Sequence, residues 1–351
     1  MKSTAKYSKK EIPNREAEYI CTFISGFSDI VSKQIKQKLK GVKIIRLFDG
    51  LIHFLYAGSP FDISRLVFLN NTFFVISKFT SKNLTFKSMA LQVSKINFRI
   101  MDTKAESFRV RFSKENKFEK VPERVSDIAE YSVKKNSSLK IDRINPSTEF
   151  WFIIRREGIG FFAQLLKKRG ATEKSLRKGE LRPELAHLLC GAAEIKPHYT
   201  VLDPFAGYGS IPNQILQNFK FKKMYINDID KNLADKLRKS PLGENALTEI
   251  TNVNADNMAH IPSNSVDIII TDPPWGIFEN IADISKFYAG FLKEFKRVLK
   301  NGATAILLTG SPLEALDAAK TAALTTINRR DILVNGKKAS VIVLKKQKEV
   351  L

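Results

Sequence analysis

Cysteine and histidine are both scarce in this chain, and their scarcity excludes two common kinds of site. The 351 residues include only two cysteines, Cys21 and Cys190, which are far apart and lack CxxC spacing. A disulfide framework or a thiolate metal site is therefore not expected, and a reducing cytoplasm fits this cysteine content. The four histidines are scattered, whereas metal ligands cluster, so we expect no bound metal.

Long apolar runs are also missing. No apolar stretch reaches the roughly 18 residues of a membrane span, so none is expected. Residues 1–17 are polar and rich in lysine, without the apolar stretch of a secretory signal, and they are interpreted as a disordered basic lead-in. Hydrophobic residues still make up 43% of the chain. The composition therefore predicts a cytoplasmic protein with two or three globular domains.

Acidic residues are too few to balance the basic ones, and the imbalance is local. The chain has 58 Lys and Arg against 36 Asp and Glu, a net charge of +22. Residues 1–180 hold 36 of these basic residues against 18 acidic ones. Because neutralising phosphates releases counterions, this excess favours a nucleic-acid partner for the N-terminal half. A lysine-rich surface that serves solubility alone is the alternative.

Two small units are expected in the N-terminal half, at residues 18–84 and 85–166. In the first unit, strands are predicted at Tyr19–Ser25 and Phe73–Phe79, and helices at Asp29–Leu39 and Phe61–Leu69. The segment Val42–Tyr56 is predicted to hold two short strands, broken near Asp49-Gly50 as in a hairpin. In the second, Phe108–Phe112 alternates apolar and basic side chains, which is the period of a half-buried strand. The other elements expected there are Pro122–Tyr131, Ser147–Arg155 and Gly158–Leu166. Residues 167–180 are polar, basic and without a period, so they are predicted to be a linker.

Strand and helix patterns alternate in residues 181–351, as a doubly wound sheet requires. The strands are expected at Thr200–Asp203, Lys223–Asn227, Ile250–Asn254, Val266–Thr271 and Ala303–Thr309. The helices are expected at Leu181–Ala193, Ile211–Gln217 and Ile284–Leu299. Asn335 and Gly336 lie between two apolar runs, a strong signal for a type I′ hairpin. The sequence thus predicts an α/β fold whose parallel sheet ends in an antiparallel hairpin.

Carboxylates follow four of these strands, and parallel strands collect such residues at one edge of the sheet. They are Asp203, Asp228, Asp256 and Asp272. Asp203 opens a turn, Asp203-Pro-Phe-Ala-Gly207-Tyr-Gly209-Ser210, whose glycines let a ligand approach the backbone. An acidic residue after the second strand can accept hydrogen bonds from ribose hydroxyls. One such Asp is usually a helix cap or a turn residue, but four in register favour a nucleoside site.

The fourth strand leads into Asp272-Pro-Pro-Trp-Gly276. Its β-branched apolar run is typical of a strand buried on both faces, and open α/β sheets bind ligands where such strands end. Pro273 and Pro274 fix the backbone. Trp275 offers a flat face on which a base can stack. A structural Pro-Pro turn with a core tryptophan is the alternative.

This loop and turn resemble those of class I S-adenosylmethionine-dependent methyltransferases that act on amines. The mark of that branch is Asp or Asn, two prolines and an aromatic residue. Leu181-Arg-Pro-Glu-Leu-Ala186 and the glycine turn are further similar to the RNA guanine-N2 methyltransferases that carry a THUMP domain. The resemblance implies a Rossmann-like class I methyltransferase domain at residues 181–351. It also implies a ferredoxin-like domain at 18–84 and a THUMP-type RNA-binding domain at 85–166.

The resemblance also implies a cofactor site for S-adenosylmethionine. Gly207 and Gly209 would line the methionine part of the donor, Asp228 would hold the ribose, and Asp256 would accept from the adenine amino group. The other residues implied around the cofactor are Arg182, Pro183, Asp203, Phe205, Ala206, Ile229, Asn257 and Asp272.

The implied activity is methyl transfer to the N2 amine of a guanosine, with tRNA as the expected substrate and no metal. Asp272, Pro273, Pro274 and Trp275 would form the catalytic loop. An rRNA guanine-N2 enzyme, a DNA adenine-N6 or cytosine-N4 enzyme and a non-catalytic RNA-binding protein are the alternatives. Trp275, where the family commonly has tyrosine, and Tyr208, where a small residue is usual, depart from the family pattern.

Overall fold

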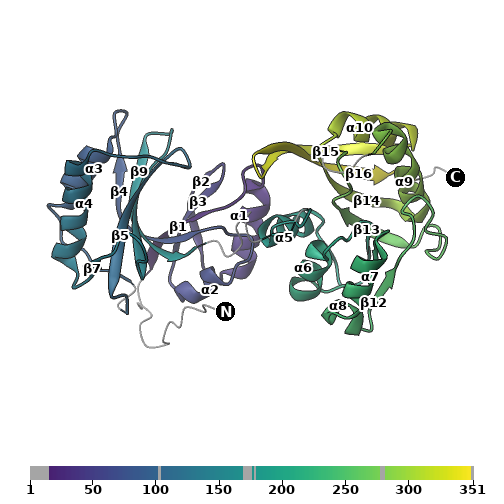
Figure 1. Ribbon diagram of the computed structural model, residues 1–351, viewed down its shortest axis with the longest axis horizontal. Helices are drawn as coiled ribbons and strands as arrows, with labels where there is room; N and C mark the ends of the chain where they lie inside the picture. The colour runs from purple at the N-terminus through teal and green to yellow at the C-terminus, as the bar shows by residue number, and fades with distance from the viewer. Residues whose placement is uncertain (1–15, 102–103, 169–175, 178, 277–280, 349–351) are drawn as a thin grey trace. The chain divides into compact units, whose positions relative to one another are not determined.

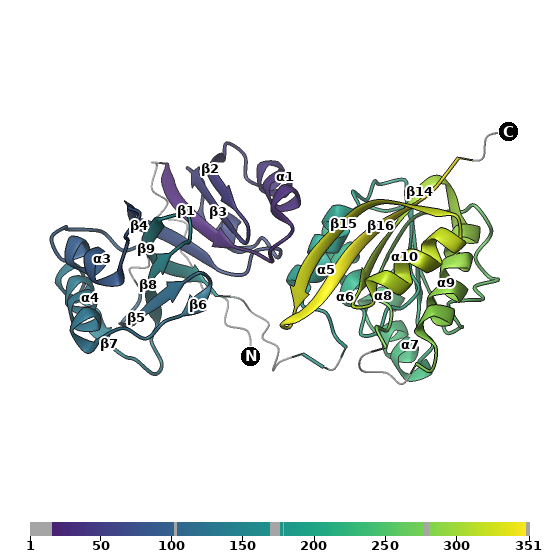
Figure 2. The ribbon, with the colours of Figure 1, turned by 90° about the horizontal axis from the view of Figure 1, so that it is seen from above.

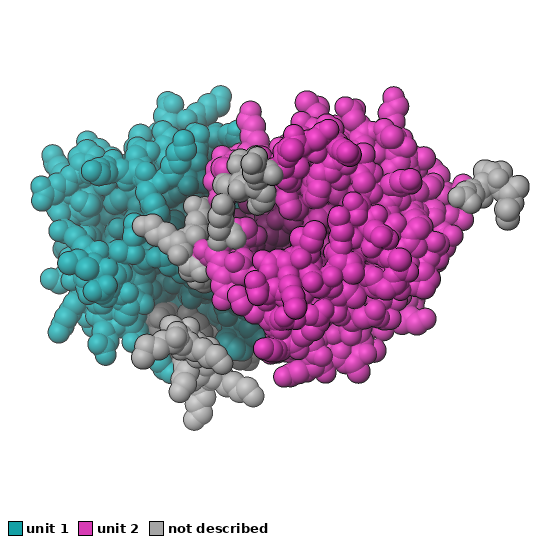
Figure 3. Space-filling model, turned by 45° about the vertical axis from the view of Figure 1, so that its right-hand side comes forward, with its two compact units in different colours: residues 1–23, 32–170 teal, residues 24–31, 171–351 magenta. Residues whose placement is uncertain are grey.

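The computed structural model describes residues 16–101, 104–168, 176–177, 179–276 and 281–348. The chain forms two compact units, residues 1–23 with 32–170, and residues 24–31 with 171–351 (Figure 3). The described residues leave out residues 1–15 of the predicted lead-in. They also leave out residues 169–175 and 178 of the predicted linker. No helix in the described ranges is long and apolar enough to cross a bilayer.

A nine-stranded sheet organises the first unit, in the order β2-β3-β1-β4-β9-β8-β5-β6, with β7 paired to β5. The strands are β1 (Ala17–Thr22), β2 (Lys43–Phe48), β3 (Leu51–Tyr56), β4 (Thr72–Thr80), β5 (Ser107–Lys114), β6 (Lys117–Phe118), β7 (Lys140–Ile141), β8 (Thr148–Ile154) and β9 (Ile159–Lys167). The helices are α1 (Ser28–Lys38), α2 (Pro60–Ser64), α3 (Phe86–Val93) and α4 (Glu123–Asn136). Because β4 pairs with β9, the two predicted N-terminal units share one sheet. The division between them at residue 84 stays a prediction.

Both faces of this sheet are covered where β8 crosses it, because every residue of β8 is buried. Phe150 and Phe152 pack into the core that contains residues of α3 and α4. Trp151 and Ile153 pack into a second core with β1, β4 and β9 residues. Figure 2 shows α3 and α4 side by side along one face of the sheet. The continuous apolar character of β8 follows from this two-sided burial.

Two helices of the first unit differ from the prediction. The helix expected at Phe61–Leu69 is the short α2, which ends at Ser64. Beyond it, Leu66 and Leu69 donate backbone hydrogen bonds three residues back, as in isolated turns. The helix α3 was not predicted. It begins after Thr85, whose side chain and that of Ser88 form a capping box.

The second unit contains a seven-stranded sheet in the order β12-β11-β10-β13-β14-β16-β15. Its strands are β10 (Thr200–Asp203), β11 (Lys223–Asn227), β12 (Thr248–Thr251), β13 (Val266–Thr271), β14 (Leu299–Thr309), β15 (Leu324–Val334) and β16 (Lys337–Lys346). The strands from β10 to β14 pair in parallel, and β16 is antiparallel to β14 and β15. Asn335 and Gly336 have φ of 53° and 79°, as a type I′ turn requires. The predicted α/β sheet with a C-terminal antiparallel hairpin is confirmed.

Helices cover both faces of the second sheet (Figures 1 and 2). On one face, α9 (Ile284–Val298) and α10 (Pro312–Thr321) bury their apolar sides in a common core with the strands. On the other face lie α5 (Pro183–Ala192) and α6 (Ser210–Asn218). Two shorter helices, α7 (Lys231–Arg238) and α8 (Pro241–Glu244), follow β11. β10 lies between β11 and β13, so the carboxyl ends of these three strands meet at one edge.

Candidate functional site

Three of the four predicted carboxylates stand directly at this edge. Asp203 is the last residue of β10, Asp228 follows β11, and Asp272 follows β13. The fourth, Asp256, is further from its strand, because β12 ends at Thr251 and not at the predicted Asn254. Asp256 is exposed in the turn that comes next, and its backbone N–H donates to the side chain of Asn254 at 3.3 Å.

Asp203 is a buried carboxyl that joins β10 to β13. Its Oδ1 accepts from the Thr271 hydroxyl at 2.8 Å and from the backbone N–H of Phe205 at 3.3 Å. Its Oδ2 is buried and has no hydrogen-bond partner among the described residues. Burial raises the pKa of Asp203 to about 7. This environment favours the neutral acid, which suits a structural link between strands better than contact with a ligand.

The raised pKa makes the stability of the protein depend on pH. An unfolded Asp has a pKa of about 3.9, so between about pH 4 and 7 the folded chain holds a proton that the unfolded chain has lost. The stability that Asp203 contributes is therefore complete below about pH 4 and is lost as the pH rises to about 7. We expect Asp203→Asn to remove this dependence. Between pH 5 and pH 8 its Tm should rise relative to that of the unmodified chain by about 5 °C, for a change on the order of 2 kcal/mol. Parallel curves of Tm against pH would contradict this.

Asp228 braces the glycine turn. Its Oδ2 accepts from the backbone N–H of Gly207 at 2.6 Å, and its Oδ1 from that of Asp230 at 2.8 Å. Partial burial raises the pKa of this carboxyl above its usual value, and the two backbone N–H groups oppose that rise. A carboxylate has about four acceptor sites, so these bonds leave capacity for hydroxyl groups of a ligand.

The two glycines of the turn are required for different reasons. Both have positive φ, 54° at Gly207 and 81° at Gly209. A Cβ added to Gly207 would meet no atom within 4 Å, so open space lies beside it. A Cβ added to Gly209 would lie 2.7 Å from the Leu237 side chain, so this glycine allows close packing against α7. Gly207 is therefore the one that offers a ligand an approach to the backbone.

Asn227 is a site residue that the sequence did not single out. Its buried side chain donates to the carbonyls of Pro204, at 3.2 Å, and Val253, at 3.0 Å. Its Oδ1 accepts from the Thr251 hydroxyl at 2.9 Å and the Val253 N–H at 3.0 Å. Asn227 thus ties together the segments that follow β10, β11 and β12. Its position directly before Asp228, at the end of a buried strand, was the signal that could have found it.

The loop after β13 is held by its own tryptophan. The indole Nε1–H of Trp275 donates to Asp272 Oδ1 at 2.8 Å, and the side chain is only 9% exposed. The Ser311 hydroxyl donates to the backbone carbonyl of Trp275 at 2.8 Å. The Tyr288 hydroxyl lies 3.5 Å from the Pro274 carbonyl and 2.6 Å from the Thr309 hydroxyl. Tyr288 and Ser311 were not foreseen as supports of this loop.

The environment of Trp275 differs from the open stacking face that the sequence suggested. The ring is largely buried, as the core-tryptophan alternative expected, yet its polar atom is bonded to Asp272. The reason is the indole N–H, a donor that must find an acceptor when buried, and the carboxylate three residues earlier supplies one. Trp275 therefore holds Asp272 in a fixed orientation. Gly276, with φ of 73°, ends this part of the loop.

The remaining predicted residues surround the edge at different depths. Arg182 is the N-cap of α5 and Pro183 its first residue, where proline is well suited. The Phe205 ring packs against Phe287 and Phe291, with centroids 5.8 and 5.1 Å apart. The remaining three are the buried Ala206 and the exposed Ile229 and Asn257. No group of three or more His, Cys, Asp or Glu that could hold a metal ion occurs in the part of the chain that the structure describes.

Comparison with known proteins agrees with this geometry. Residues 171–338 match the model of a family described as RMKL-like, methyltransferase domain. The chain carries a methyltransferase domain. The matched residues include the glycine turn, Asp228 and the Asp272–Trp275 loop, so the predicted kind of catalytic domain is confirmed.

Two curated relatives share part of the chain. Over 138 residues it is 33% identical to "U6 snRNA (guanine-N(2))-methyltransferase THUMPD2" of Bos taurus, which is 38% of this chain and 26% of that protein. Over 214 residues it is 26% identical to "tRNA (guanine(6)-N2)-methyltransferase" of Thermus thermophilus, which is 59% of this chain and 63% of that protein. The chain thus matches less than two thirds of the length of either relative.

A solved structure extends the likeness beyond the methyltransferase domain. The crystal structure of TrmN from Thermus thermophilus is similar with a TM-score of 0.78 and 20% sequence identity. The match covers 94% of this chain and 99% of that chain. This likeness shows a shared fold.

Proposed function

We propose that this chain transfers a methyl group from S-adenosylmethionine to the N2 amine of a guanosine in RNA, with tRNA as the substrate. One observation carries the proposal. The glycine turn, which Asp228 braces, follows β10, and the Asp272–Trp275 loop follows β13. Because β10 and β13 are neighbours, the turn and the loop stand side by side at one edge of the sheet of a methyltransferase domain. The names of the two relatives support guanosine N2 in RNA as the target. The excess of basic residues in the N-terminal half supports a polyanionic substrate.

The donor fits the residues around the glycine turn. The open space beside Gly207 admits the methionine part, and Asp228 has acceptor capacity left for the ribose hydroxyls. Arg182 and Pro183 stand at the N-terminus of α5, where the helix dipole favours the donor carboxylate. Asp256, which is exposed in the turn after β12, accepts a hydrogen bond from the adenine amino group. When bound, S-adenosylmethionine supplies a methyl group that its sulfonium already makes electrophilic.

The residues of the loop after β13 orient the guanine amine. Asp272 and the Pro273 carbonyl supply acceptors for the two N–H groups of this amine. Accepting both favours a pyramidal nitrogen whose lone pair faces the methyl group. As the N–CH3 bond forms, the bond from the methyl group to the sulfonium sulfur breaks, which would leave a neutral thioether. The nitrogen is cationic until it loses one of its protons to solvent, and the Asp272 charge stabilises this cation. The chain contributes chiefly positioning, which can supply about 7–11 kcal/mol of a barrier.

Trp275 acts on this reaction as a positioning residue for Asp272. We expect Trp275→Phe, which keeps an aromatic ring but removes the N–H, to lower kcat by about tenfold or more, because a hydrogen bond to a charged group is worth about 1.5–3 kcal/mol. The KM for the donor should stay within twofold. Steady-state kinetics on purified protein measure both values.

A double-mutant cycle separates this role from base stacking. If Trp275 acts through the carboxylate, Trp275→Phe should have little further effect in an Asp272→Ala background, which has no acceptor for the indole N–H. Equal losses in both backgrounds would mean that Trp275 contributes by itself, as a stacking surface would. Melting curves of all four proteins control for damage to the loop.

The N-terminal half binds the RNA and selects the nucleotide that reaches the loop. This proposal includes a ferredoxin-like domain at residues 18–84 and a THUMP-type domain at 85–166. A guanine amine inside a duplex is out of reach of such a loop, so the target nucleotide is flipped out or lies at a distorted position. A cytoplasmic location, consistent with the low cysteine content, is part of the proposal.

One experiment tests the function directly. The purified chain is incubated with isotope-labelled S-adenosylmethionine and either total RNA or DNA, and the labelled nucleosides are identified by mass spectrometry. Labelled N2-methylguanosine in the tRNA fraction is the expected product. Label in another base, or in DNA alone, would overturn the assignment.

A further inference from the structure

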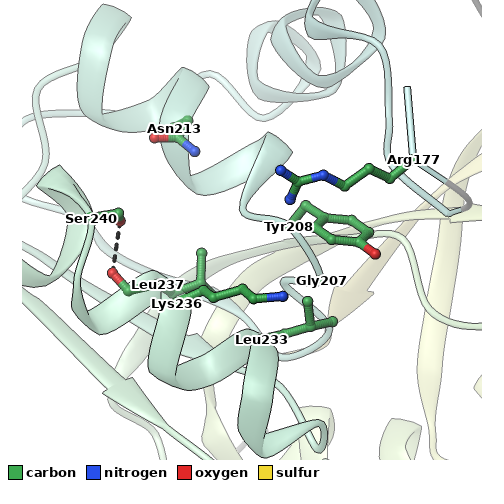
Figure 4. Close-up of a pocket in the computed structure, with 8 residues that line it drawn as sticks. All are labelled: Arg177, Gly207, Tyr208, Asn213, Leu233, Lys236, Leu237 and Ser240. Atoms are coloured by element: carbon green, nitrogen blue, oxygen red, sulfur yellow. Dashed lines mark hydrogen bonds between the residues drawn. The ribbon is translucent and has the colours of Figure 1, made fainter. Parts of the chain in front are cut away.

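A pocket of about 180 Å³ opens beside the glycine turn, on the side of α6 and α7 (Figure 4). It is lined by Arg177, Gly207, Tyr208, Asn213, Leu233, Lys236, Leu237 and Ser240. Only Gly207 belongs also to the proposed donor site. The carboxylates of that site, Asp228 and Asp256, do not line the pocket. The pocket therefore lies next to the proposed donor site and is distinct from it.

Its charged lining is entirely basic. Arg177 lies over the ring of Tyr208, with the guanidinium carbon 4.8 Å from the ring centroid. Lys236 comes from α7 on the opposite side, and Figure 4 shows its side chain running beneath Tyr208. Among the described residues, neither side chain forms an ion pair with a carboxylate, and the Glu180 carboxylate accepts from the backbone N–H of Arg177 at 3.0 Å. The nearby Asp235 is paired with Arg238 at 2.6 Å, so it does not neutralise the pocket.

Tyr208 explains how Arg177 is held. A guanidinium stacked on an aromatic face keeps its N–H donors free in its plane, and this flat fork matches the oxygens of a phosphate. The sequence singled out Tyr208 only as a departure from the family pattern, because a small residue is usual at this position. The structure shows Tyr208 as the platform for an arginine.

We propose that this pocket binds a backbone phosphate of the nucleic-acid substrate beside the donor turn. The proposal rests on the RNA-methylating function above. Arg177 supplies a planar pair of donors and Lys236 a second positive charge, which together suit one phosphate group. Such a contact positions the strand next to the reacting groups without reading its sequence. It places a phosphate-binding site in the methyltransferase unit. The distribution of charge in the sequence had indicated nucleic-acid binding only for the N-terminal half.

The test compares the full-length chain with Arg177→Ala/Lys236→Ala. The control is the double variant Lys231→Ala/Lys239→Ala. Lys231 is the first residue of α7 and Lys239 follows its last residue; both are exposed, and neither lines the pocket. Binding of an unmodified tRNA transcript is measured by fluorescence anisotropy at several salt concentrations. Binding of S-adenosylhomocysteine is measured by calorimetry, and melting curves confirm that each variant is folded.

The pocket variant should lose about tenfold or more in tRNA affinity, and its salt dependence should become shallower by about one to two phosphate contacts. The control should change less than threefold, and both should bind S-adenosylhomocysteine within twofold of the unmodified chain. Equal tRNA affinity for pocket variant and control would overturn the proposal. So would weakened S-adenosylhomocysteine binding with intact tRNA binding, because the cations would then serve the donor. Calorimetry with inorganic phosphate is a further measurement. Phosphate binding that the pocket substitutions weaken, without any effect on tRNA affinity, would mean that the pocket binds a free anion instead.

These outcomes are separable from those of the function itself. If the unmodified chain methylates guanosine in tRNA and the pocket variant binds tRNA as the control does, only the pocket assignment fails. If no RNA is methylated by the unmodified chain, the proposed function fails whatever the pocket variant does.

Discussion

Asp272→Ala is expected to lower kcat by about a thousandfold. In the proposed reaction, the substitution removes an acceptor for the guanine amine and the charge that stabilises the developing cation. Losses of about 10²–10³ are typical when one such group is deleted. Asp272 lies at the end of a buried strand, with its Oδ1 held by the Trp275 N–H at 2.8 Å, so its position is well defined. Single-turnover methylation of tRNA with saturating donor measures the effect on the chemical step.

Two further measurements make this result specific. Binding of tRNA should stay within a few fold, because the substitution leaves the basic surfaces unchanged. Asp272→Asn, which keeps the size and one acceptor oxygen, should retain more activity than Asp272→Ala. Near-normal turnover of the alanine variant would remove Asp272 from the chemistry, and a large fall in melting temperature would point to a collapsed loop instead.

The second large effect is expected at the donor. Asp228→Ala should weaken binding of S-adenosylhomocysteine by about a hundredfold or more. In the proposed donor site, the substitution removes the acceptor for the ribose hydroxyls. It also leaves the backbone N–H groups of Gly207 and Asp230 without their partner. Hydrogen bonds to a charged group contribute about 1.5–3 kcal/mol each. Losing the bonds to two ribose hydroxyls therefore weakens binding by about a hundredfold or more. Isothermal titration calorimetry measures it.

The control for this prediction is Asp256→Ala. Asp256 is exposed and braces no glycine turn, so its loss should weaken donor binding by no more than about tenfold. Asp228→Asn should fall between the two, since one amide oxygen can still accept. If Asp256→Ala is the more damaging substitution, the ribose and adenine assignments must be exchanged.

Much of the fold could be predicted because local patterns and tertiary contacts agree. The β8 alternation of Phe150 and Phe152 with Trp151 and Ile153 matches the two cores on either side of the sheet. Asn335-Gly336 forms the turn that its sequence favours, with both φ values positive. Helix α3 was missed although its buried residues, Phe86, Met89, Ala90 and Val93, have helical spacing. That spacing, together with the cap at Thr85, can be read from the sequence, so this helix could have been predicted.

The site was predicted less completely, because hydrogen bonds between distant segments leave no local pattern. Asn227 joins the ends of three strands through its side chain, and Ser311 holds a carbonyl 36 residues before it in the chain. The contact between Arg177 and Tyr208 likewise pairs a residue of the predicted linker with one of the glycine turn. Each of these contacts depends on how strands and loops are brought together.

The sequence by itself determined the kind of chemistry. Strands that end in Asp203, Asp228 and Asp272, a turn with Gly207 and a basic N-terminal half were enough to predict a nucleoside site and a nucleic-acid partner, because strand ends in a parallel sheet converge on one edge. The resemblance of the turn and of the Asp272–Trp275 loop to amine methyltransferases implied the reaction. Only the tertiary structure decided what each carboxylate does. Asp203 is sealed between two strands and favours its neutral form, Asp228 braces the turn, and Asp272 is held by the indole of Trp275. The reason is physical: burial and hydrogen-bond partners set the charge and orientation of a carboxylate, and both arise from contacts between segments that the linear sequence keeps apart.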